Sequence, residues 1–159
     1  VKTISAMTSS QSHLDIETED IGAIIMQMTD GVICEIHVDY VQQPASRNCK
    51  VVGDNGTLTW DLDRHTVEHY DPRTNTWETH ELPEWDMNKM YISEMEHFLE
   101  CVADRSKTIC DIEDASHDLQ AGLAALYSAE SGEHITVSPV SSNPTKDGVH
   151  NGLEQDTKQ

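Results

Sequence analysis

Residues 30–43, Asp-Gly-Val-Ile-Cys-Glu-Ile-His-Val-Asp-Tyr-Val-Gln-Gln, decide the fold of this 159-residue chain. The Asp30-Gly31 turn is followed by residues that alternate in character over 32–41. Because a strand points successive side chains to opposite faces, Glu35, His37 and Asp39 share one face. The other face carries Val32, Cys34, Ile36, Val38 and Tyr40. The alternation predicts a strand with one face on a core and the other face polar.

The flanking segments have strand character too. Ile21–Met28 is apolar on both alternating faces, so it predicts a strand that is buried on two sides or contacts another subunit. Further strands are predicted over 48–52, 57–62, 66–70 and 76–80. They are joined by turn residues such as Asp54-Asn55-Gly56. Because these connections are short, we expect antiparallel pairing.

Two amphipathic helices follow the strands. Apolar residues at helical spacing from Met90 to Val102 predict the first, and the second begins after Asp111 and ends at Gly132. A last strand is predicted over 134–137. This order predicts an α+β fold, a mostly antiparallel open sheet with two C-terminal helices packed on one face. We expect one domain over 1–140 and a disordered tail over 141–159.

The composition excludes several classes of partner. Acidic residues number 29 and basic residues 10, giving a net charge of -19. Nucleic acid and anionic membranes need a cationic face, so neither is an expected partner. No apolar run approaches the ~20 residues of a membrane span. The four cysteines form no Cys-x-x-Cys pair, and we interpret them as reduced thiols of a cytoplasmic protein.

Three groups of side chains could carry chemistry but have plainer explanations. His65 and His69 would lie about 13 Å apart along a strand, which disfavours a shared metal ion. Cys49 has no assignable histidine base, so a structural cysteine is the better interpretation. The third group could do acid–base chemistry, although an acidic strand entry is the simpler interpretation in so acidic a chain. It comprises Glu17, Glu19 and Asp20.

Arg47 is the strongest candidate for a binding residue. It is one of four arginines and follows the loop Gln42–Ser46 between two predicted strands. Its guanidinium could make a bidentate contact with a phosphate or a carboxylate. The alternative is a salt bridge with one of the many acids of the chain.

Several short motifs occur in a fixed order along the chain. They are Asp30-Gly31, Asp39-Tyr40-Val41-Gln42-Gln43-Pro44 with Arg47, Val52–Leu58, Met90–Leu99, Asp111–Asp114 and Ser128–Gly132. In this order the motifs resemble the C-terminal domain of the Gfo/Idh/MocA oxidoreductases, over roughly residues 1–140 of the chain.

The resemblance implies a two-domain NAD(P)-dependent dehydrogenase. Its N-terminal Rossmann domain binds NAD or NADP and supplies a lysine from a Glu-Lys-Pro motif. A further helix supplies an aspartate and a histidine four apart, the histidine acting as base. None of these motifs lies in this sequence, so we assign no catalytic, cofactor-binding or metal-binding residue. We expect the chain to be a fragment that is inactive by itself.

The resemblance also implies that this domain forms a wall of the substrate pocket and the homo-oligomer interface. We therefore expect Tyr40, Gln42 and Arg47 to contact a sugar or sugar-nucleotide substrate. The interface is expected to use apolar residues of the strand over 21–28. They are Ile21, Ala23 and Ile25, or their alternates. The alternative function is a stand-alone dimerisation or ligand-binding module without chemistry.

Overall fold

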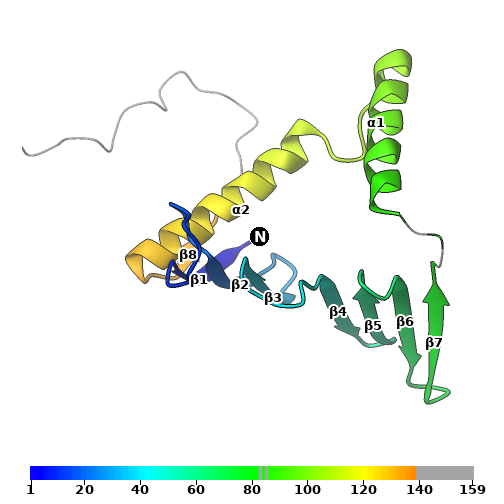
Figure 1. Cartoon of the computed structure of the whole chain (residues 1–159), viewed down its shortest axis with the longest axis horizontal. Coiled ribbons are helices and arrows are strands. Elements are labelled where there is room, and N and C mark those ends of the chain that lie inside the picture. The colour runs from blue at the N-terminus through cyan, green and yellow to red at the C-terminus, as the bar shows by residue number, and fades with distance from the viewer. Residues whose placement is uncertain (83, 85, 139–159) are drawn as a thin grey trace, which may run out of the picture. The chain divides into compact units, whose positions relative to one another are not determined.

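The computed structural model describes residues 1–82, 84 and 86–138, where seven strands precede two helices and a short last strand (Figure 1). The strands are β1 (Thr3–Ser9), β2 (Ile21–Gln27), β3 (Ile33–Asp39), β4 (Asn48–Gly53), β5 (Gly56–Asp61), β6 (Thr66–Asp71), β7 (Thr76–Glu81) and β8 (Ile135–Thr136). The helices are α1 (Met87–Asp104) and α2 (Ile112–Ser131). Each strand and helix predicted individually from the sequence is confirmed, with small differences at its ends.

The described strands form two four-stranded sheets, in the orders β3-β2-β1-β8 and β4-β5-β6-β7. The second is an antiparallel meander, and β8 pairs antiparallel with β1. The α+β class is confirmed, but the strands are divided between two sheets where the sequence predicted one. The division falls at residues 40–47, where Pro44 has no N–H to donate to a strand ladder.

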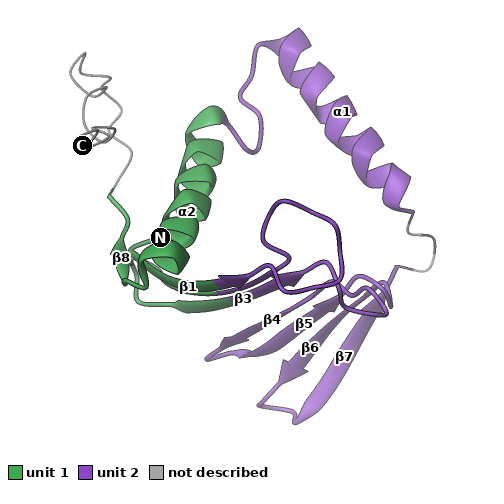
Figure 2. Ribbon diagram, turned by 60° about the vertical axis from the view of Figure 1, so that its left-hand side comes forward, with its two compact units in different colours: residues 1–7, 24–35, 112–159 green, residues 8–23, 36–111 purple. Residues whose placement is uncertain are grey.

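The chain divides into two compact units, coloured separately in Figure 2. Unit 1 contains Val1–Met7, Ile24–Glu35 and the chain from Ile112 onward. Unit 2 contains Thr8–Ala23 and Ile36–Asp111, and therefore includes the segment 40–47 and the β4–β7 sheet.

In unit 1 the core lies between α2 and β1. Ile4 of β1 is fully buried, and Ala125 and Ser128 of α2 are buried as well. The Ser128 hydroxyl accepts the N–H of Ala6 at 3.0 Å and donates to the carbonyl of Glu133 at 2.6 Å. Apolar packing and hydrogen bonds therefore fix the C-terminal half of α2 to β1.

In unit 2 the β4–β5 hairpin has the two-residue turn that the sequence predicted. Gly53 pairs with Gly56, which leaves Asp54 and Asn55 as the turn. Gly56 has a φ of 136°, and a Cβ there would overlap the carbonyl oxygen of Tyr70. This position therefore requires glycine for its backbone conformation and for the approach of β6.

The helix ends also follow the sequence. Helix α1 begins after Asp86, whose carboxylate accepts the N–H of Asn88 at 3.0 Å. Helix α2 begins directly after Asp111 and is followed by Gly132 in the left-handed conformation, with φ 71°. The tail predicted over 141–159 lies outside the described residues.

Candidate functional site

The three residues expected to contact substrate lie on the segment between β3 and β4. Tyr40 directly follows β3 and is 68% exposed, and Gln42 and Arg47 are exposed as well. The structure therefore places all three on one connecting segment, residues 40–47. We call this segment the β3–β4 loop.

Asp39, the last residue of β3, anchors the start of the β3–β4 loop. Its Oδ1 accepts the N–H of Val41 at 2.8 Å and the N–H of Gln42 at 2.5 Å. Its Oδ2 is 2.9 Å from Nε2 of His37. The side chain is only 8% exposed. The Gln42 N–H first, and then the N–H of Val41 and His37, hold the pKa of the Asp39 carboxyl below its ordinary value.

A second acid, Asp20, holds the same loop through its backbone. Its carbonyl accepts the N–H of Tyr40 at 3.0 Å, and its own N–H donates to Ser9 at 2.9 Å. Its carboxylate is nearly fully buried and accepts the N–H of Ser12 at 2.7 Å. The hydrogen bond with the Ser12 side chain is the main cause of its lowered pKa. This member of the predicted acidic cluster therefore supports the fold at the base of the loop.

The Gln42 side chain closes the loop on itself. Its Nε2 donates to Oγ of Ser46 at 2.5 Å and lies 3.5 Å from the carbonyl of Pro44. The Gln43-Pro44 peptide bond is cis. With Nε2 engaged inside the loop, Oε1 is the atom of Gln42 best placed to accept a hydrogen bond from a ligand.

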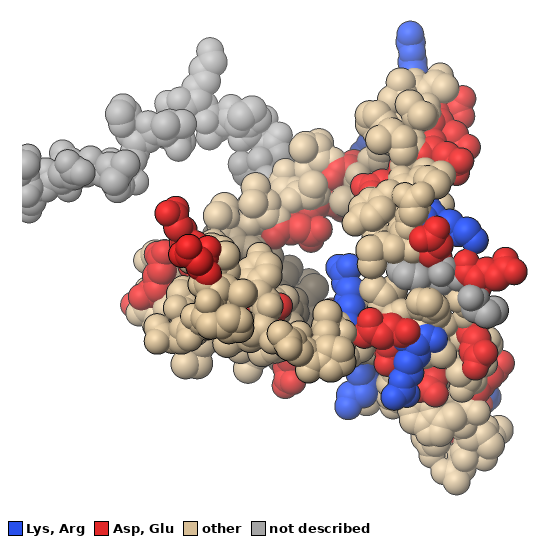
Figure 3. All heavy atoms as spheres, in the orientation of Figure 1, with Lys and Arg blue, Asp and Glu red and all other residues tan. Residues whose placement is uncertain are grey.

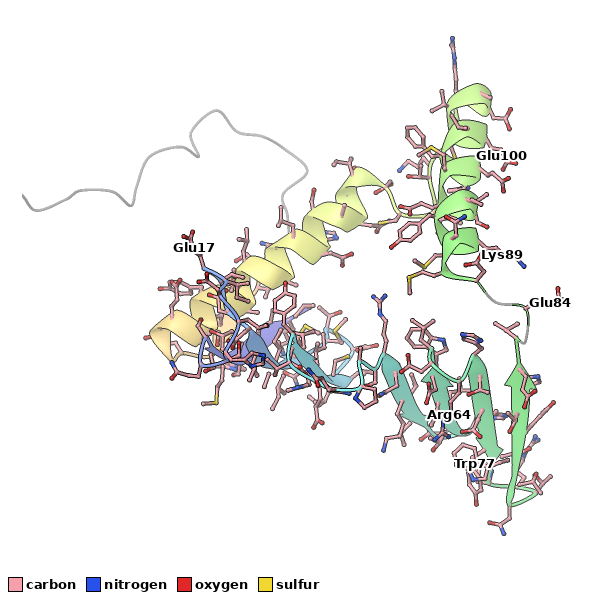
Figure 4. The ribbon with its side chains drawn as sticks, in the orientation of Figure 1. Glu17, Arg64, Trp77, Glu84, Lys89 and Glu100 are labelled. Atoms are coloured by element: carbon pink, nitrogen blue, oxygen red, sulfur yellow. The ribbon has the colours of Figure 1, made fainter. Side chains whose placement is uncertain are left out.

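Arg47 has no ion pair among the described residues. Two other arginines have carboxylate partners, Arg64 with Asp61 at 3.6 Å and Arg73 with Asp71 at 2.9 Å. Arg64 is labelled in Figure 4. Acidic side chains are spread over the face of the molecule that Figure 3 shows, so partners for an arginine are plentiful. The Arg47 carbonyl accepts the N–H of Leu62 at 3.0 Å, which fixes its backbone beside the end of β5. The structure thus offers an exposed guanidinium rather than the salt bridge of the alternative.

The remaining candidates do not form a site. In the part of the chain that the structure describes, no group of three or more histidine, cysteine or acidic residues is arranged to bind a metal. All four cysteines are free thiols, and Cys49 is exposed. None of the β3–β4 loop residues lines the hollow found in the β4–β7 sheet, but Leu62, whose N–H donates to the Arg47 carbonyl, does. The hollow is lined by Trp60, Leu62, His65, Thr66, Val67 and Leu82.

Asp39 was missed as a site residue in the sequence, although a signal was present. An aspartate that ends a strand and precedes a turn commonly accepts backbone N–H groups two and three residues on. The sequence assigned Asp39 only to the polar face of its strand, because its turn partners depend on how the loop folds back.

The described residues do not fit a bound dinucleotide. Its pyrophosphate needs a glycine-rich turn that leads from a parallel strand into the positive N-terminus of a helix. Here α1 begins at the carboxylate of Asp86, and the first turn of α2 carries Glu113 and Asp114. Neither helix start follows a glycine-rich turn, and carboxylates already lie at both, so we assign no step of NAD(P) chemistry to these residues.

A family model described as the oxidoreductase family, C-terminal alpha/beta domain, matches residues 2–137. The chain belongs to the Gfo/Idh/MocA oxidoreductase family. This Gfo/Idh/MocA domain therefore includes both described helices, all eight described strands and the β3–β4 loop. A search of curated proteins finds no match.

Solved structures of the same fold cover most of the domain. An oxidoreductase from Agrobacterium radiobacter in complex with NAD+, L-tartaric acid and magnesium is 17% identical, with a TM-score of 0.73 over 86% of this chain and 43% of that chain. Levoglucosan dehydrogenase in complex with NADH is 10% identical, with a TM-score of 0.80 over 87% and 45%. Aldose-aldose oxidoreductase from Caulobacter crescentus, complexed with glycerol, is 17% identical, with a TM-score of 0.70 over 85% and 41%.

The Gfo/Idh/MocA domain spans less than half the length of each of these structures. At such identities the likeness shows the fold. No helix in the described ranges is both long and apolar enough to span a membrane.

Proposed function

We propose that this domain is the substrate-binding and oligomerisation part of a longer NAD(P)-dependent dehydrogenase that acts on a sugar or sugar nucleotide. The family match over residues 2–137 carries the proposal, and the structural neighbours include complexes with NAD+ and NADH and two sugar-processing enzymes. We assign the dinucleotide and the hydride-transfer residues to another part of that enzyme, because the glycine-rich turn and the Glu-Lys-Pro lysine do not occur in this sequence. The chain alone is then without turnover, and its free thiols suit a cytoplasmic enzyme.

The β3–β4 loop is the proposed substrate contact. Arg47 presents a cation without an ion-pair partner among the described residues, in a chain of net charge -19 where Arg64 and Arg73 pair with acids. Such a group binds a phosphate or carboxylate of the substrate without first breaking an ion pair. Tyr40 adds an exposed aromatic ring to the same loop, and Gln42 adds a carbonyl acceptor.

Replacing Arg47 tests this contact. Charge-assisted hydrogen bonds contribute about 1.5–3 kcal/mol, so Arg47→Ala should weaken binding of a UDP-sugar about 10- to 150-fold. Because Arg47 forms no ion pair with the described residues, the melting temperature should stay unchanged. Arg64→Ala, which removes an arginine of the β5–β6 hairpin, is the matched control and should leave affinity intact. Equal affinity of Arg47→Ala and the unsubstituted protein would contradict the assignment.

The open face of the first sheet is the proposed subunit interface. A Cβ at Gly22 would lie 3.2 Å from Val38 Cγ2 and 4.0 Å from Thr8 Cγ2, so the even-numbered positions of β1–β3 share one face. Buried Ile4 belongs to that face. The opposite face presents Ile25 at 54% exposure, together with Met7 at 77% and Ile33 at 57%. Within β2, Ala23 and Ile25 are exposed, whereas Gly22 is buried and Ile24 and Met26 are half-buried, which favours Ile21, Ala23 and Ile25 over their alternates as interface residues.

Size-exclusion chromatography with light scattering tests the interface. We expect a dimer or larger species at micromolar concentration, and Ile25→Lys should dissociate it, because a buried unpaired charge opposes association. Thr79→Lys, at an exposed position of β7, is the control and should leave the assembly intact. A monomeric unsubstituted chain would contradict the interface.

A further inference from the structure

We propose that Asp39 is a positioning residue for ligand binding: its carboxylate holds the β3–β4 loop in the conformation that presents Tyr40, Gln42 and Arg47. The inference rests on the proposed function, and it adds a residue that itself need not touch the ligand. It also gives His37 a role as the second partner of that carboxylate.

The Asp39 carboxylate makes three contacts, and two of them are directed at the backbone of the loop. One oxygen of Asp39 accepts two consecutive N–H groups, those of Val41 and Gln42, and the other oxygen faces His37 Nε2. A carboxylate that accepts two backbone donors fixes the turn that follows it, because both donors must point at one atom. The backbone of Gln42 is therefore set by Asp39.

Asp39 is nearly buried, unlike the loop that follows it. The Asp39 side chain is 8% exposed, whereas the residues of the loop that it holds are exposed. A nearly buried acid at the base of an exposed loop can act on a ligand only through the loop. Its charge is compensated by the two N–H groups and by His37, which is itself 61% exposed.

The backbone that Asp39 fixes is joined by further hydrogen bonds to the part of the loop that carries Arg47. Gln42 donates from Nε2 to Ser46 Oγ, which ties the middle of the loop to the residue before Arg47. The Arg47 carbonyl is in turn held by the N–H of Leu62. The contacts thus run from Asp39 through Gln42 to Ser46, the residue before Arg47, and their loss at Asp39 would release the backbone at Val41 and Gln42.

The test compares Asp39→Ala and Asp39→Asn with a matched control, Asp30→Ala. Asp30 also accepts a backbone N–H from the residue two positions on, that of Val32, at 3.2 Å from its Oδ1. It lies before the start of β3 and therefore outside the β3–β4 loop. The amide hydrogen exchange rates of Val41 and Gln42 measure whether the loop keeps its conformation. Calorimetry measures the affinity for UDP-glucose. Circular dichroism verifies that each variant folds, and Asn retains an oxygen acceptor should the Ala variant fail to fold.

We expect Asp39→Ala to speed exchange of the Gln42 amide and to weaken UDP-glucose binding about tenfold, the factor that corresponds to one lost hydrogen bond. In Asp39→Asn, the exchange rate of the Gln42 amide and the affinity for UDP-glucose should return most of the way to those of the unsubstituted protein. Asp30→Ala should change neither the exchange rate nor the affinity. Unchanged Gln42 exchange, or unchanged affinity in a chain that binds UDP-glucose, would overturn the inference alone. An unsubstituted chain in which UDP-glucose neither binds nor perturbs the loop amides would instead overturn the proposed function.

Discussion

Replacing Ser128 by alanine should lower the free energy of unfolding by about 1.5–4.5 kcal/mol, because two part-buried hydrogen bonds are lost together. Ser128 is 1% exposed and lies on α2, where its hydroxyl accepts from Ala6 of β1 and donates to Glu133 beyond the helix. Strand β8 pairs only with Thr3 and Ile4, so Ser128 takes the place of a strand partner for Ala6.

The magnitude follows from what each partner can do after the change. The Ala6 N–H is part-buried, and leaving such a donor unpaired costs about 1–3 kcal/mol. The Glu133 carbonyl belongs to an exposed residue that water can reach, so its loss costs about 0.5–1.5 kcal/mol. Removal of one oxygen leaves too small a space to add much of a cavity cost.

Urea unfolding followed by circular dichroism measures the effect. Ser116→Ala is the matched control on the same helix, since its hydroxyl only donates back to the Ile112 carbonyl at 2.6 Å, a bond that contributes little to helix stability. We expect Ser116→Ala to stay within about 0.5 kcal/mol of the unsubstituted protein. Equal stability of the two variants would refute the claim that Ser128 joins α2 to β1.

Two further predictions concern unit 2. Gly56→Ala should destabilise the protein by more than about 1 kcal/mol, because the φ of Gly56 is positive and a Cβ would overlap the Tyr70 carbonyl. Gly53→Ala is the control, since the space around Gly53 is open. Equal melting temperatures of the two variants would contradict the reasoning. The Arg73 guanidinium holds the pKa of Asp71 at about 2, against an ordinary value of 3.8. Since a depressed pKa contributes stability that is lost as pH falls through the folded value, Arg73→Ala should move that loss to higher pH, with an Asp71 pKa nearer 3.8 by NMR titration. A titration unchanged by the substitution would show that Arg73 is not the cause.

The strands and helices could be predicted from local patterns. Alternation in the residues over 32–41 and the Asp54-Asn55-Gly56 turn each depend on neighbours in the sequence, which is why β3 and the β4–β5 hairpin appear where expected. The ends of α2 follow from Asp111 and Gly132 for the same reason.

The division into two sheets and the anchoring of the loop could not be predicted. Whether β3 and β4 share a sheet depends on the path of the β3–β4 loop, which no periodicity describes. Whether Arg47 meets an acid depends on side chains far apart in sequence, and Asp39 was assigned only to a polar strand face. Tyr40 lies on the β3–β4 loop with Gln42 and Arg47, although its sequence pattern placed it in the strand over 32–41, and the contact of the three residues with substrate stays a prediction.

The measurement that tests the central claim most directly is the sequence of the coding DNA upstream of the Val1 codon. The account predicts that it encodes a strand, a Gly-x-Gly-x-x-Gly turn and a helix, the fingerprint of a domain that binds NAD or NADP. An initiation codon within a few residues of Val1 would contradict the dehydrogenase assignment and leave a domain that binds or dimerises without chemistry of its own.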